Sequence, residues 1–139
     1  QINLNDTLVT IYDVHLANPL IADDFDPKAH GEGITALLDL LANESQPLIV
    51  AGDFNMTDAS TDYGRMTENL VDSFRESGSG FGLTFPAWSP LLAVRLDYIF
   101  HSSDLRSLKT EVVSSSGESD HFPVRSELMI DHVPVTQSP

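Results

Sequence analysis

The stretch IVAGDFNMT, residues 49–57, places an acid and an amide directly after an apolar run. Side chains two residues apart on extended backbone point the same way, so Asp53 and Asn55 would project together while Phe54 turns into the core. A carboxylate and an amide aimed at one point can hold a hard cation or a water nucleophile. The alternative is an Asx-turn, in which Asp53 only caps its own strand.

Three other apolar segments also carry polar residues at or near their ends. The segment YDVH ends on His15, Asp97 interrupts the run RLDYIF, and Asp120 and His121 directly precede FPV. A buried, unpaired carboxylate is costly, so Asp97 needs a polar partner. Each residue taken alone could be structural, as an isolated histidine often is. Because strand ends in layered α/β folds gather at one crevice, we expect these side chains to meet the acid–amide pair.

The elements that must position these residues follow from the hydrophobic pattern. The expected strands are 8–14, 47–52, 95–101, 109–115 and 122–130, and in the last of them Phe122, Val124, Leu128 and Ile130 alternate with Arg125, Glu127 and Met129. The expected helices carry apolar faces made of Ile34, Leu37, Leu38 and Leu41 in the first, and of Met66, Leu70, Val71 and Phe74 in the second. Loops are expected at 16–33 and 83–94, and a frayed tail at 131–139. The alternation of helices and strands, with a strand-rich second half, indicates one α/β or α+β domain over residues 1–139.

Composition narrows the classes of function. The chain has 139 residues, is 41% hydrophobic, and carries a formal net charge of −14. Such acidity disfavours long nucleic acid, whose phosphates are normally neutralised by Lys and Arg, but a small phosphorylated substrate held through a divalent cation is compatible with it. No cysteine is present, so a metal would be held by oxygen or imidazole. No run is long and apolar enough for direct membrane insertion.

Four motifs, in this order, resemble the endonuclease/exonuclease/phosphatase superfamily, whose members include deoxyribonuclease I. They are VHLANP, LIVAGDFNMT, RLDYIF and SDHFPV. The resemblance implies a four-layer α/β sandwich with a mostly antiparallel or mixed sheet, of which this chain would be the C-terminal portion. It also implies a metal-dependent phosphoesterase that hydrolyses a phosphodiester or phosphomonoester with Mg²⁺ or Mn²⁺ and an in-line water.

The resemblance assigns a role to each matching residue. Asp53 would orient and deprotonate the water, and Asn55 would bind a phosphate oxygen and help to place Asp53. Both would also lie at the metal. His121 would donate to the phosphate and stabilise developing charge, with Asp97 fixing its tautomer. The bottom-up chemistry agrees, because phosphoryl transfer mainly needs positioning and charge stabilisation.

Further residues complete the expected site. Asp120 matches the family's metal-linked acid, and His15 matches a histidine that contacts the phosphate. Phe85 and Trp88 lie near the expected crevice, where Trp88 would either bind substrate by stacking or act as a hydrophobic plug. A zinc site built on His15 and His121 is the competing metal interpretation.

The resemblance also implies that residues 1–139 are half of a domain, since the family domain runs to about 250 residues. The family's early Asn-bearing and Glu-bearing strands do not precede His15 here, and that Glu is its principal metal ligand. A half domain would expose apolar sheet surface, so we expect a homodimer or a complementing N-terminal fragment. Activity of the fragment would then be weak or absent, and the alternative is an inactive interaction module or structural α/β fragment. A similarity of TFPAW and RLDY to bacterial members suggests an extracytoplasmic or membrane-associated parent.

Overall fold

Within residues 1–4, 6–18, 27–45 and 47–131, which the computed structural model describes, the chain forms seven strands, three α-helices and one 3-10 turn. In chain order these are β1 (Ile2–Leu4), β2 (Thr7–His15), α1 (Pro27–Leu41), β3 (Leu48–Asp53), α2 (Thr61–Thr67), β4 (Val71–Asp72), α3 (Ser73–Ser77), η1 (Pro90–Leu92), β5 (Asp97–His101), β6 (Leu105–Val112) and β7 (Val124–Ile130).

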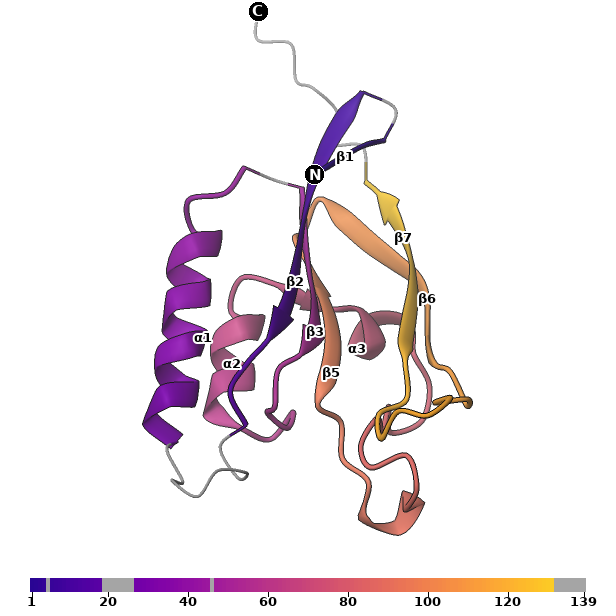
Figure 1. The fold of residues 1–139 in the computed structure, drawn as a ribbon. Coiled ribbons are helices and arrows are strands. Elements are labelled where there is room, and N and C mark those ends of the chain that lie inside the picture. Colours follow the sequence, from indigo (N-terminus) through magenta and orange to yellow (C-terminus); the bar gives the residue numbers. More distant parts are fainter. Residues whose placement is uncertain (5, 19–26, 46, 132–139) are drawn as a thin grey trace, which may run out of the picture.

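The strands form two sheets. The larger has five strands in the order β1-β2-β3-β5-β4, and β6 and β7 form a second, two-stranded sheet. Strands β2 and β3 are parallel and the other neighbours are antiparallel, so the large sheet is mixed. In Figure 1, α1 and α2 lie on one side of the large sheet, and α3 with the β6–β7 pair lies on the other. The expected mixed α/β class with a mixed sheet is confirmed.

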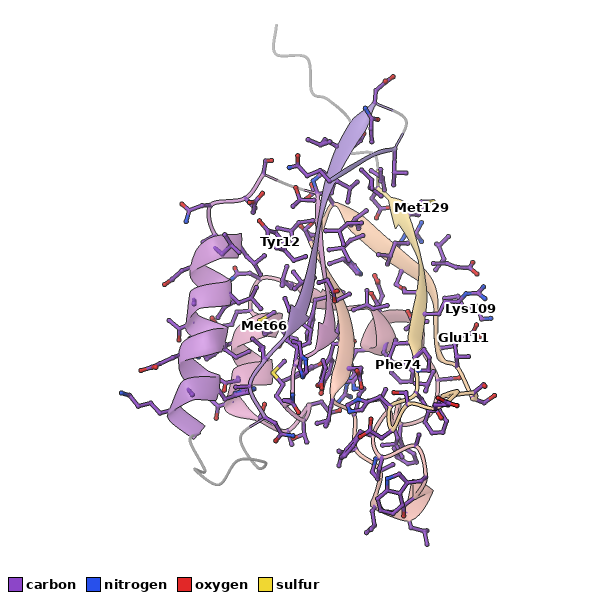
Figure 2. The ribbon with its side chains drawn as sticks, viewed as in Figure 1. Tyr12, Met66, Phe74, Lys109, Glu111 and Met129 are labelled. Carbon is purple, nitrogen blue, oxygen red and sulfur yellow. The ribbon has the colours of Figure 1, made fainter. Side chains whose placement is uncertain are left out.

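The hydrophobic core lies between the large sheet and the helices α1 and α2. Met66 of α2, labelled in Figure 2, is fully buried there. Its neighbours in the core are Ile34, Leu37, Leu41, Leu48, Val50, Phe54, Met56, Leu70, Tyr98 and Phe100. Burying one such side chain contributes about 1.5–3 kcal/mol, so this layer anchors the strands that carry the polar residues. None of the described helices is long and apolar enough to cross a membrane.

Helix α1 begins earlier than its apolar face indicated. The expected loop 16–33 is wrong for its last seven residues, which are helical from Pro27 onward. A proline at the first helical position loses no hydrogen bond. The internal glycines Gly31 and Gly33 each cost about 1 kcal/mol, which the buried residues of the helix offset. Residues 19–26 of the expected loop lie outside the described residues.

The second expected helix is interrupted. Met66 belongs to α2, Val71 to β4 and Phe74 to α3, and Leu70 lies between α2 and β4, because Val71 pairs with His101 of β5 and Asp72 caps α3. The Asp72 carboxylate accepts the Phe74 N–H, and this cap restarts the helix in a new direction.

Strand boundaries also shift. The strand expected at 95–101 begins only at Asp97, as β5, and the strand expected at 109–115 is β6, which covers Leu105–Val112. Strand β1 was not expected at all. The alternation in the last strand is confirmed, and Met129, Lys109 and Glu111 lie on the outer side of the β6–β7 pair (Figure 2). In the expected tail, the Asp131 N–H bonds the carbonyl of Asp104, and 132–139 lie outside the described residues.

Candidate active site

Three polar residues form one row across the large sheet. In the strand register His15 of β2 lies beside Asp53 of β3, and Asp53 lies beside Asp97 of β5. Strands β2 and β3 end at this row, whereas the antiparallel β5 begins there. Asp97 therefore starts its strand instead of interrupting it, and the three side chains reach one edge of the sheet.

The backbone around Asp53 has an unusual shape. Gly52 has φ +141°, and a Cβ there would lie 1.9 Å from the carbonyl oxygen of Val14, so only glycine fits. Asn55 is in the left-handed region with φ +48°. Its N–H donates to Asp53 Oδ1 at 2.8 Å, which is the geometry of an Asx-turn. The Asx-turn and the site are thus the same structure, because the turn is what aims the carboxylate.

The side chain of Asn55 is engaged within the protein. It is 8% exposed, and its amide nitrogen donates to the Leu16 carbonyl at 2.8 Å and to Asp53 Oδ2 at 3.2 Å. These contacts use the amide hydrogens to hold Asp53, so they favour the positioning role assigned to Asn55.

His121 reaches the row from the loop between β6 and β7. Its Nδ1 lies 2.8 Å from Asp97 Oδ2, and its Nε2 lies 4.0 Å from Asp53 Oδ2. Since Asp97 can only accept when ionised, His121 donates through Nδ1–H and turns Nε2 toward Asp53. The ring of Phe85 packs against the imidazole with centroids 4.7 Å apart.

Thr84 connects this loop to β5 through hydrogen bonds. The Thr84 carbonyl accepts the Phe122 N–H at 2.8 Å, and its hydroxyl accepts the N–H groups of Leu96 and Asp97 at 3.1 and 3.3 Å. Thr84 is fully buried, so it fixes the start of β5 relative to the residue that follows His121. Hydrogen bonds from one buried residue to both segments explain how two distant parts of the chain keep Asp97 and His121 in contact.

These side chains surround a cavity of about 450 Å³. Its lining residues are His15, Asn18, Asp53, Asn55, Phe85, Leu96, Asp97, Asp120 and His121. Asn18 and Leu96 were not among the expected site residues. Asn18 lies in the motif VHLANP, whose polar residue after a strand end was the available signal.

Two expected site residues lie further from the centre. Asp120 lines the cavity and is exposed, but it is not part of the close cluster that Asp53, Asp97 and His121 form. Trp88 is 74% exposed and is not among the lining residues. Trp88 is therefore not a hydrophobic plug in this structure.

The electrostatics of Asp53 are those of a carboxylate that is partly removed from water. Burial and, to a smaller degree, the charge of Asp97 raise the pKa of Asp53, while the Asn55 N–H and the two nearby imidazoles lower it. His15, whose side chain is 79% exposed, places Nε2 3.7 Å from Asp53 Oδ2. The net upward shift moves Asp53 toward the range in which a carboxylate can accept a proton from water.

The donor set suits a divalent cation. Among the residues that the structure describes, Asp53, Asp97 and His121 offer ligand atoms that all lie within 4.8 Å of one another. Asp53 and Asp97 place two carboxylates at this point, and carboxylate oxygens are preferred ligands of Mg²⁺ and Mn²⁺. His15 is not in this cluster, so the two-histidine zinc interpretation gains no support from it.

Comparison with known proteins places this arrangement in a class. The family model of the Endonuclease/Exonuclease/phosphatase family matches residues 5–121, which include all the residues of the cavity. The chain belongs to the endonuclease/exonuclease/phosphatase family. No curated protein matches the chain.

Solved structures with the same fold extend the comparison. A conserved protein of unknown function from Enterococcus faecalis is 22% identical with a TM-score of 0.72, over 87% of this chain and 50% of that one. A mannosyl-6-phosphatase from Bacteroides thetaiotaomicron is 23% identical with a TM-score of 0.69, over 86% and 51%. A Neisseria 3' phosphatase, bound to a product DNA hairpin, is 19% identical with a TM-score of 0.61, over 88% and 61%. The chain thus spans about half the length of the first of these structures, and the likeness concerns the fold.

Proposed function

We propose that this chain carries catalytic residues of a metal-dependent phosphoesterase. The observation that supports the proposal most is the convergence of Asp53, Asp97 and His121 from β3, β5 and a distant loop on one cavity. Family membership supports hydrolysis of a phosphate ester as the reaction class.

Each residue has a role that its contacts permit. Asp53 accepts a proton from the attacking water at Oδ2, with Oδ1 held by the Asn55 N–H. His121, whose Nδ1–H is held by Asp97, can donate Nε2–H to a phosphoryl oxygen in its doubly protonated, imidazolium form as charge develops. His15 is exposed beside Asp53 and can donate to a second phosphoryl oxygen. These are positioning and electrostatic roles, which are what phosphoryl transfer requires.

A divalent cation, Mg²⁺ or Mn²⁺, would be held by Asp53 and Asp97, and Asp120 and Asn55 line the same cavity. When bound, the cation supplies positive charge to the phosphate and acidity to bound water. Asp97 would then have two contacts, one with the cation and one with His121 Nδ1–H.

The proposed substrate is a phosphate ester that is small or lipid-like. The net charge of −14 repels a long polyanion, so the protein would favour a substrate with one or two phosphates. The titles mannosyl-6-phosphatase and 3' phosphatase, carried by two proteins with this fold, support phosphate esters as the substrate class.

A complementing surface is also part of the proposal. Ile2, Leu4 and Ile11 lie on one face of the β1–β2 pair and are 42, 43 and 43% exposed. Together with the half-length match to the solved structures, this exposure supports a second copy or a complementing segment that covers the face. A monodisperse monomer of 15.2 kDa in light scattering would contradict this part of the proposal.

The same exposed face favours the second candidate function, an inactive interaction module. The two candidates differ in what removal of the cavity residues does. An interaction module would still bind its partner when His121 is changed, whereas an esterase would lose turnover.

The experiment compares hydrolysis of p-nitrophenyl phosphate and bis-p-nitrophenyl phosphate with Mg²⁺, with Mn²⁺ and with EDTA. We expect hydrolysis of one ester that stops in EDTA, returns with added metal and falls strongly in His121→Asn. The matched control is Asp13→Asn, an exposed acid of β2 outside the cavity, which should behave as the wild type. Metal-independent turnover, or equal rates in His121→Asn and wild type, would contradict the proposal.

A further inference from the structure

A buried histidine outside the cavity contacts the backbone of the site. His30 of α1 is 5% exposed, and its Nε2 lies 2.8 Å from the carbonyl oxygen of Phe54. Because a carbonyl oxygen can only accept, the hydrogen on Nε2 is donated to Phe54. Phe54 lies between Asp53 and Asn55, so this hydrogen bond connects α1 to the backbone of the candidate site.

The Phe54–Asn55 peptide is therefore held from two sides. Its carbonyl oxygen accepts from His30, and its N–H donates to Asp53 Oδ1 at 2.8 Å. A peptide group is planar and rigid, so its carbonyl cannot turn without turning the N–H on the other side. The orientation of the Asp53 carboxylate is coupled in this way to the side chain of His30.

The peptide needs such a restraint because of its neighbours' conformation. Asn55 has φ +48°, a left-handed conformation that costs a residue with a Cβ about 1–2 kcal/mol. A rotation of the preceding peptide would relieve this conformation and would withdraw the N–H from Asp53. A buried hydrogen bond on the opposite end of the peptide opposes that rotation.

His30 is itself held in place by α2. Its Nδ1 lies 3.1 Å from Asp62 Oδ2, which accepts a hydrogen bond when the ring carries a hydrogen on both nitrogens, and Asp62 Oδ1 accepts from Arg65 Nη1 at 3.0 Å. Arg65 in turn donates to the Thr35 hydroxyl on α1 at 2.8 Å. These contacts link α1 to α2 through four side chains. Of the four, His30 also contacts the backbone of the site, at the Phe54 carbonyl.

We propose that His30 is a positioning residue for Asp53, acting through the Phe54–Asn55 peptide. The catalytic consequence rests on the proposed function, whereas the structural coupling does not. Its chemistry is the donation of one hydrogen bond to a backbone carbonyl, and no bond is made or broken at His30 during turnover.

Two variants separate this donation from the packing of the histidine. In His30→Gln the side-chain amide nitrogen can occupy the place of Nε2 and keep the bond to the Phe54 carbonyl. In His30→Asn it can occupy the place of Nδ1 and keep the bond to Asp62 instead. Both variants lose ring volume, and Asp62→Asn serves as a third variant that leaves the Nε2–H donation intact.

The kinetic measurement is the rate of metal-dependent aryl phosphate hydrolysis at saturating substrate. We expect His30→Asn to lower kcat about 10- to 100-fold with little change in KM, because a small misplacement of a reacting group has effects of this size. His30→Gln and Asp62→Asn should stay within about threefold of the wild type. Equal losses in His30→Asn and His30→Gln, or none in either, would overturn the proposal.

A second measurement does not need activity. Hydrogen exchange of the Asn55 N–H, followed by NMR in the 139-residue chain, should be at least tenfold faster in His30→Asn than in His30→Gln after correction for global stability. If His30→Asn does not fold, retained protection of this N–H in His30→Gln supports the proposal and lost protection overturns it. An inactive wild type whose exchange follows this pattern would overturn the proposed function and leave the positioning role standing.

Discussion

Asp53 and Asp72 share one local structure. Each is the last residue of a strand in the large sheet, and each accepts a backbone N–H from two residues further along. The Asn55 N–H donates to Asp53 at 2.8 Å and the Phe74 N–H donates to Asp72 at 2.9 Å. The two aspartates match in this bond, and Asp72 accepts in addition the Arg75 N–H at 3.4 Å as the N-cap of α3.

Their surroundings differ in permanent charge. Asp72 is 4% exposed and receives Arg95 Nη2 at 2.9 Å and the Tyr63 hydroxyl at 2.9 Å. The Arg95 guanidinium is itself 4.7 Å from the centroid of the Tyr98 ring. A guanidinium that is always charged neutralises the carboxylate, so Asp72 is a structural residue.

Asp53 has another carboxylate and two imidazoles where Asp72 has an arginine. Its register neighbour is Asp97, and the histidines His15 and His121 lie at 3.7 and 4.0 Å. Its negative charge is left available for a cation, a proton or a water. The turn thus directs both carboxylates, and the absence of a paired arginine is what distinguishes Asp53 from Asp72.

The largest expected effect is on activity at Asp53. Asp53→Asn keeps an oxygen that can accept the Asn55 N–H but removes the carboxylate that we propose as the proton acceptor for water. We expect hydrolysis of bis-p-nitrophenyl phosphate to fall about 10²- to 10⁴-fold, the usual contribution of a general base. The apparent melting temperature should be unchanged or higher. The control is Asp13→Asn. Turnover of Asp53→Asn within threefold of the wild type would contradict the proposed difference in role between Asp53 and Asp72.

The second effect is on stability at Asp72. Arg95→Met leaves a buried carboxylate without its cation, and we expect a loss of about 3–5 kcal/mol in the free energy of unfolding, measured with urea. The matched control is Arg106→Met, because Arg106 is half-exposed and pairs with Asp131 at 3.4 Å. That surface pair should contribute less than about 1 kcal/mol. Equal losses in the two variants would show that Asp72 does not depend on Arg95.

A smaller effect is expected at Asp97. Asp97→Asn removes the charge that holds His121 Nδ1–H but preserves the size of the side chain. We expect kcat to fall roughly 10- to 100-fold, as for other partners that orient a site histidine. The NMR signals of the His121 ring nitrogens should report the altered tautomer. Unchanged ring signals together with unchanged kcat would show that Asp97 neither orients His121 nor supports hydrolysis.

The smallest effect is the pH dependence of stability at Asp53. Burial raises the pKa of Asp53 above its ordinary value of 3.8, so the folded chain binds the proton more tightly than the unfolded chain. The resulting stability is complete below 3.8 and is lost as the pH rises through the folded-state pKa. Asp53→Asn should therefore gain stability relative to the wild type as the pH is raised from 3 toward 7. A relative loss over the same range would mean that the shift has the opposite sign.

The parts of this molecule that depend on short patterns could be predicted from sequence. The apolar spacing of Ile34, Leu37 and Leu41 identified the buried face of α1, and alternation identified β7. Asp53 was recognisable because glycine, acid and amide follow a strand within four residues. The mixed α/β class followed from the order of these elements.

The parts that depend on distant pairing could not be predicted. Asp72 and Arg95 are far apart in sequence, and the pattern from Met66 to Phe74 suited a helix until β4 paired with His101. His30 lay in a stretch whose proline and glycines predicted a loop. Its contact with the Phe54 carbonyl depends on how α1 packs on the site's backbone, which no local sequence pattern encodes.

The most direct test of the central claim is where a divalent cation binds. Amide spectra of the chain, recorded during titration with low concentrations of paramagnetic Mn²⁺, report the residues nearest the ion. We predict that broadening begins at Asn55, Asp97 and His121 and spares Asp72 and Phe74. Broadening that begins around Asp72, spreads evenly over the acidic surface, or is absent would contradict the assignment of Asp53 to a metal-dependent phosphoesterase site.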